Sequence, residues 1–143
     1  MGRASPTIDV RVEAVDLSVT MLRLNIDLAL AGRSGPNRGR LVKPFARGYI
    51  FGFSHACIQR FGVTDEMQSL ALITLVHIKV FGQEMGSLLA GDTLGEEGDS
   101  EFIRGRTAGA GDLFRWLDDR AYTPLSLTDY LQSDDKASTA AVG

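Results

Sequence analysis

The chain has few of the residues that build disulfides and metal centres. Its 143 residues include a single cysteine, Cys57, so no disulfide can form within the chain and no cysteine-rich zinc module fits it. Two histidines, His55 and His77, are too few for most multi-histidine metal sites. We therefore expect neither a bound metal nor a cofactor.

Long apolar runs are also missing. The longest stretch in the middle of the chain without a charged residue or a histidine, Met67–Val76, is ten residues long, whereas a membrane-spanning helix needs about 20. Charged residues that alternate with apolar ones after Pro6 interrupt the apolar segment that a secretory signal requires. We expect a cytoplasmic protein without a membrane partner.

The net charge is small but unevenly distributed. The formal charge is −3 at pH 7, which argues against a general nucleic-acid binder. Residues 1–63 hold nine Lys or Arg against four Asp or Glu, and residues 64–143 hold six against fourteen. We expect the two halves to attract each other in the folded chain, with steering of a charged partner as the alternative.

The segment 7–31 carries two apolar seams at heptad spacing. Its residues also alternate with polar ones, as those of a half-buried strand do. The alternation changes phase twice without a turn residue, and a helix absorbs such shifts whereas a strand does not. We predict a helix here, with an N-terminal β-hairpin as the alternative. The clearer seam consists of Ile8, Val12, Val15, Val19, Leu22, Ile26 and Ala29.

Helices and loops are predicted in turn along the middle of the chain. Glycine and proline mark a loop over 32–44, and a helix follows from Pro44 to Phe61. Thr64 is the expected N-cap of the next helix. This helix crosses the whole body over 65–90, breaks near Gly82 or reaches into a partner. Apolar residues surround most of the axis of this helix, which indicates that it forms the buried centre.

The last third is predicted to hold an acidic loop and two shorter helices. The loop covers 91–100, and a helix over 101–120 is interrupted near Gly109, where Asp112 caps a new start. A short helix begins at Ser126, and 133–143 form a flexible tail. The fold class is therefore all-α. It is a single domain over 1–132, a bundle of four to six helices with a buried central helix.

Small residues recur at intervals of four within the predicted helices. Such spacing forms a flat ridge that lets another helix backbone approach closely. Glycine costs about 1 kcal/mol relative to alanine inside a helix, so its repeated use needs a reason. We interpret Gly48, Gly52, Gly82 and Gly86 as helix-packing or interface residues. The alternative is a bare helix face that admits a ligand or a partner helix.

His55 is the strongest candidate for a functional side chain. On a helix it shares one face with Gly48, Gly52 and Gln59, which leaves room in front of the imidazole. An imidazole titrates near physiological pH and can act as an acid, a base or a donor to an anion. The alternative is an ordinary packing role.

A basic segment follows the first predicted helix. Five cations lie within 33–47, and Arg40 and Arg47 are the ones expected to join His55 and Gln59 around a pocket for a small anionic ligand. The alternative is a solvated loop that pairs with the acidic half. No complete catalytic set is present, so no catalytic residue is assigned. His77 and Glu84 are two helical turns apart, too far to chelate one ion.

One nonapeptide, Gly48–Ala56, resembles the Gly-Tyr-Ile-x-Gly helix of Tai-type immunity proteins of bacterial type VI secretion. Those proteins have an acidic residue in place of His55 and carry export signals and further cysteines, which this chain does not share. The likeness covers nine of 143 residues, and no family is assigned from it.

Two functions are consistent with these patterns. The surplus of apolar seams and the absence of a catalytic set predict a non-enzymatic interaction or regulatory module that associates with itself or with another protein. The alternative is a small-ligand or anion-binding protein, with or without catalytic activity, whose pocket involves His55 and the basic segment.

Overall fold

The computed structural model describes residues 4–31, 35–96 and 98–132, and within these ranges every regular element is a helix. The all-α bundle is confirmed, and the segment predicted over 7–31 is helical. The predicted tail, 133–143, lies outside the described residues. The elements are α1 (Ala4–Leu30), the 3-10 helix η1 (Gly35–Val42), α2 (Pro44–Arg60), α3 (Glu66–Phe81), α4 (Gln83–Leu94) and α5 (Ser100–Asp118), and residues 126–132 add a short final helix.

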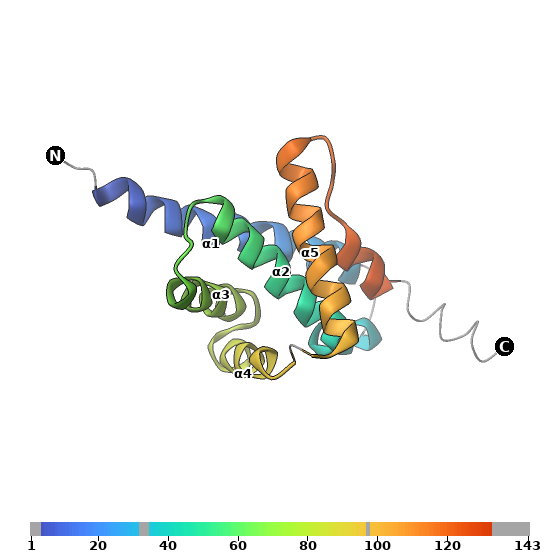
Figure 1. The fold of residues 1–143 in the computed structure, drawn as a ribbon. Coiled ribbons are helices and arrows are strands. Elements are labelled where there is room, and N and C mark those ends of the chain that lie inside the picture. Colours follow the sequence, from blue (N-terminus) through green and yellow to red (C-terminus); the bar gives the residue numbers. More distant parts are fainter. Residues whose placement is uncertain (1–3, 32–34, 97, 133–143) are drawn as a thin grey trace.

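The long helix α1 passes behind α2 and α5 in the view of Figure 1. Val15, Leu22 and Ala29 of the predicted seam are buried, whereas Val12 is 54% exposed. One face of α1 therefore packs into the core while apolar side chains remain on its other side. No helix within the described ranges is long and apolar enough to cross a bilayer.

The buried centre of the bundle is α2, and the assignment of that role to the helix over 65–90 is wrong. Twelve of the 17 residues of α2 are buried, whereas α3 has four buried residues, Ser69, Ile73, Val76 and His77. The apolar residues around α3 misled the prediction because some face solvent; Met67 is 76% exposed. Helix α2 contacts α1, α3 and α4, and it packs most extensively against α5.

Helices α2 and α5 cross each other (Figure 1), and four glycines lie where they meet. A Cβ atom added to Gly48 or Gly52 would collide with backbone carbonyl groups of α5, and one added to Gly105 or Gly109 would collide with those of α2. The two backbones are therefore in direct contact. This is the close approach that small residues at intervals of four permit.

The other predicted pair of packing glycines, Gly82 and Gly86, has two different roles. Gly82, with φ of +93°, separates α3 from α4, so the sequence-based alternative of a break near this residue holds. A Cβ atom at Gly82 would have no atom within 4 Å, so this glycine provides backbone freedom and no packing contact. Gly86 faces α3, where a Cβ atom would lie 2.6 Å from the carbonyl oxygen of His77.

Two predicted N-caps are corrected. Asp65, and not Thr64, caps α3, because its carboxylate accepts a hydrogen bond from the backbone N–H of Gln68 at 2.8 Å. Helix α5 is continuous through Asp112, so that residue starts no new helix. The acidic loop is also shorter than predicted because α4 extends to Leu94.

Asp112 instead ties the end of the described chain to the helix crossing. Its carboxylate accepts hydrogen bonds from the hydroxyl groups of Tyr49 (2.6 Å) and Tyr122 (2.8 Å) and from Ser126. Farther along, the Thr128 hydroxyl lies 2.8 Å from the buried Asn25 side-chain oxygen. The final segment is thereby joined to α1, α2 and α5.

Candidate ligand site between α2, α3 and α5

A surface cavity of about 320 Å³ lies between α2 and α5. His55 and Gln59 line it together, as their shared helix face predicts. The opposite wall comes from α5 and places a guanidinium and a hydroxyl beside them. The lining residues are Gly52, His55, Ala56, Gln59, Arg106, Thr107, Ala110 and Phe114.

A second cavity, of about 390 Å³, lies on the other side of His55 and Arg106, toward α3. These two residues line both cavities and therefore form the boundary between them. Apart from Glu66 and Ser69, the remaining wall of the second cavity is apolar. Its lining residues are Phe51, His55, Glu66, Ser69, Leu70, Ile73, Leu94 and Arg106.

Arg106 is the charged group at this boundary. Its side chain is half-buried, and it forms no hydrogen bond or ion pair with any residue in the part of the chain that the structure describes. The exposed Arg104, two residues earlier, has a partner, since it pairs with Glu101 at 2.7 Å. The Arg106 guanidinium therefore keeps its donors available to a group in either cavity.

The same charge acts on His55. Burial lowers the pKa of His55 below its ordinary value, the positive charge of Arg106 lowers it further, and the negative charge of Glu66 opposes both effects. The ring also lies 5.7 Å, centre to centre, from that of Phe51. The imidazole is therefore predominantly neutral at pH 7, with one nitrogen donating and the other accepting.

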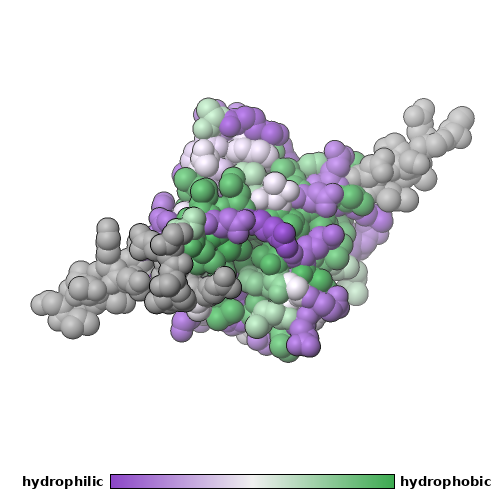
Figure 2. Space-filling view, turned by 180° about the vertical axis from the view of Figure 1, so that it is seen from behind, coloured by the Kyte–Doolittle hydropathy of each residue, from purple (hydrophilic) through white to green (hydrophobic). Residues whose placement is uncertain are grey.

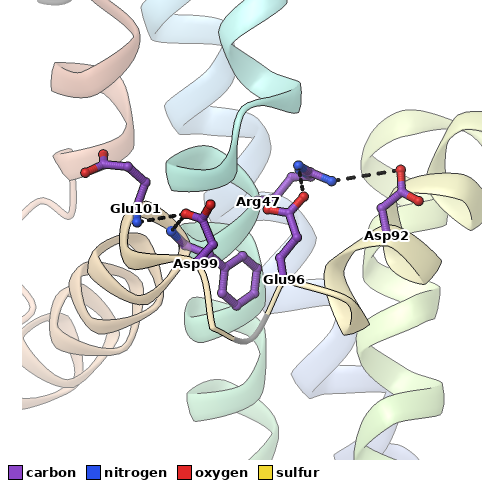
Figure 3. A network of polar contacts seen from close by, with 6 residues as sticks. Arg47, Asp92, Glu96, Asp99 and Glu101 are labelled. Carbon is purple, nitrogen blue, oxygen red and sulfur yellow. Dashed lines mark hydrogen bonds and ion pairs between the residues drawn. The ribbon is translucent and has the colours of Figure 1, made fainter.

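The two arginines expected near His55 lie elsewhere. Arg47 lines neither cavity. It pairs with Glu96, and its guanidinium also lies 3.9 Å from the Asp92 carboxylate (Figure 3). Its side chain is only 10% exposed, so its charge is used to join α2 to the end of α4. Arg40 lies in η1 and lines neither cavity.

Sequence reasoning missed Arg106, although one signal for it was present. The glycine ridge of α5 includes Gly105, and that of α2 includes Gly52. Pairing the two ridges would have placed Arg106 next to His55. Spacing along the chain identifies each ridge separately, and nothing in that spacing shows that the two ridges face each other.

The remaining candidates for chemistry supply no metal or reactive thiol site. Within the described ranges, no group of three or more His, Cys, Asp or Glu side chains is arranged to hold a metal ion. Cys57 is buried, its thiol lies 3.6 Å from the Ala14 carbonyl oxygen, and burial raises the pKa of the thiol. A buried thiol of raised pKa is a poor nucleophile.

Comparison with known proteins does not add to this description. No protein-family model matches the chain, and no curated protein or solved structure is significantly similar to it. The chemistry of the site is therefore the evidence for function.

Proposed function

We propose that the chain binds a small anionic ligand at the boundary formed by His55 and Arg106. The observation that carries this proposal is the half-buried, unpaired guanidinium of Arg106 between two cavities. Partial removal of a charge from water is unfavourable, and a counter-ion offsets that cost. A carboxylate or phosphate group supplies the counter-ion and matches the two parallel N–H groups of a guanidinium.

Neighbouring groups extend this binding chemistry. Gln59 and Thr107 line the same cavity as Arg106 and can donate hydrogen bonds to an anion, and neutral His55 can donate one from its ring. His55 makes no hydrogen bond to a nucleophilic side chain within the described ranges. The arrangement therefore supports binding and not nucleophilic catalysis.

A thermal-shift screen of small carboxylates and phosphates tests the proposal. An anion at 100 times its dissociation constant should stabilise the protein by about 2.7 kcal/mol, and Arg106→Gln should abolish the shift. Arg104→Gln is the matched control, because it removes the same charge from the same helix outside both cavities. An unchanged midpoint with every anion, or an equal shift in the Arg106 variant, would contradict the proposal.

Self-association through α1 and α3 is a second candidate function, and a groove between these helices favours it. The groove has a volume of about 250 Å³, and two of its apolar residues are exposed, Val12 by 54% and Leu75 by 38%. Figure 2 shows the side of the molecule on which α1 lies, with hydrophobic residues on both sides of a hydrophilic row. The groove is lined by Arg11, Val12, Val15, Asp16, Leu72, Leu75 and Lys79.

The charges of this groove suit a second copy of the chain. Arg11 and Lys79 are positive and Asp16 is negative, so a twofold interface can bring the Asp16 of each copy against a cation of the other copy. Sedimentation velocity over a concentration series should show a dimer that Leu75→Glu dissociates. Leu88→Glu, an exposed position on α4 outside the groove, should leave the dimer intact. A monomer at every concentration would exclude this function.

A further inference from the structure

The second cavity continues inward toward α4. A smaller cavity of about 30 Å³ adjoins it, and the two share an apolar wall formed by Phe51, Leu70, Ile73 and Leu94. A space of this size accommodates about one hydroxyl group or one water molecule. The smaller cavity is completed by Thr74, His77, Ala90 and Thr93.

Two residues that line this inner cavity carry polar atoms without partners. His77 is fully buried and Thr93 is 2% exposed, yet the Nε2 atom of the first and the Oγ1 atom of the second have no hydrogen-bond partner among the described residues. Buried polar atoms of this kind are rare because the lost contact with water is unfavourable. Their position therefore calls for an occupant that can hydrogen-bond.

The hydrogen bonding of His77 defines what that occupant must offer. The Nδ1 atom lies 2.9 Å from the carbonyl oxygen of Ile73, and because a carbonyl only accepts, Nδ1 carries the proton. Burial lowers the pKa of His77, so the ring is neutral and Nε2 is an acceptor. The occupant must supply an O–H or N–H donor to it.

We infer that the ligand of this site is a small carboxylic acid with an apolar body and a hydroxyl group at its far end. The carboxylate lies at Arg106 and His55, the body lies against the apolar wall, and the hydroxyl donates to His77 Nε2 and contacts Thr93. This inference rests on the proposed function and adds the ligand class to it. Glu66 lines the same cavity, so its negative charge opposes each negative charge of the ligand and disfavours dicarboxylates more than monocarboxylates.

Matched acids that differ by one hydroxyl test this inference. Isothermal titration of the full chain with para-hydroxyphenyl acids and with their phenyl counterparts, in a series from benzoate to propionate, compares the two groups at each length. We expect at least one hydroxy acid to bind about tenfold more tightly than its counterpart, because a buried acceptor is otherwise left unpaired. Equal affinities at every length would overturn the inference and would indicate an ordered water at His77.

Variants test which residues cause the preference for the hydroxy acid. Thr93→Val keeps the shape of the side chain and His77→Phe keeps a ring, and each should reduce the preference for the hydroxy acid while the phenyl acid still binds. If His77→Phe does not fold, Thr93→Val alone decides, and an unchanged preference in it overturns the inference. Arg106→Gln should weaken the binding of both acids equally, so failure of the proposed anion binding is distinguishable from failure of the hydroxyl preference. Binding of inorganic phosphate but of neither acid would overturn the ligand class and leave anion binding in place.

Discussion

The positively charged side chains at the two ends of the α2–α5 crossing have different surroundings. Near the start of α2, Arg47 is nearly buried and paired with Glu96, so the fold itself uses its charge (Figure 3). About two turns farther along α2, His55 faces Arg106, which is half-buried and unpaired within the described residues. The contrast shows that a cation within a bundle is a candidate ligand group only where the fold leaves it unpaired.

The largest effect on stability is expected from a methyl group added where the backbones of α2 and α5 are in contact. Gly105→Ala places a methyl group against the backbone of α2 and should lower the free energy of unfolding by about 3 kcal/mol. In Gly111→Ala the new methyl group meets no atom within 4 Å, so this control should raise stability by about 1 kcal/mol. Urea unfolding measures both, and equal effects would mean that the backbones are not in contact.

Removal of the paired positive charge of Arg47 should have the next largest effect on stability. Arg47→Met leaves the partly buried Glu96 carboxylate without its partner and should cost about 2–3 kcal/mol of unfolding free energy. Arg104→Met removes an exposed pair from α5 and should change stability by less than about 0.5 kcal/mol. If the two variants unfold at the same urea concentration, Arg47 has no structural role of its own.

At the end of the crossing where His55 and Arg106 lie, removal of the positive charge should weaken ligand binding without destabilising the fold. Arg106→Gln removes a charge that has no partner among the described residues, so the unfolding free energy without ligand should change by less than about 0.5 kcal/mol. The stabilisation by bound anion should disappear in the same variant. A large loss of stability without ligand would show that Arg106 serves the fold as Arg47 does.

The smallest effect concerns the titration of His55. Its folded-state pKa lies below the ordinary 6.5, so the unfolded chain binds more protons in that window. Stability should therefore fall as the pH drops from 6.5 toward the folded-state pKa, and should be retained above 6.5. His55→Gln should remove this component, leaving that of His77, whose pKa burial also lowers.

A bound anion should raise the pKa of His55, because it offsets the positive charge of Arg106. Proton NMR of the two histidine rings, recorded as a function of pH with and without a binding acid, measures this change. The His77 ring, which lies in the inner cavity, should not report the added charge as strongly as His55 does. An acid that binds without moving the His55 titration would place the anion away from this ring.

Local patterns in the sequence predicted local structure. The heptad seams identified α1 because a helix is defined by its own periodicity, and Pro44 and Gly62 bounded α2 closely because both restrict the backbone where they stand. The same reasoning placed Gln59 beside His55, since both lie on one helix face. These inferences needed no knowledge of how the helices pack.

Relations between helices were less accessible. Apolar residues around α3 suggested a central helix, but periodicity does not reveal whether an apolar face meets another helix or solvent. Arg47 and Arg106 are the same residue type, so residue type alone does not distinguish their roles. They differ because the fold brings Glu96 next to Arg47 and not next to Arg106. Partner choice of this kind depends on tertiary structure.

The pairing of α2 with α5 also has a consequence for folding kinetics. The chain completes α3 and α4 between these two helices, so the most extensive contact of the bundle must close a long intervening segment. Proteins whose main contacts join distant parts of the chain fold more slowly than those built from successive neighbours. The helical hairpin of α3 and α4 can form early, whereas the meeting of the glycine ridges should limit the folding rate.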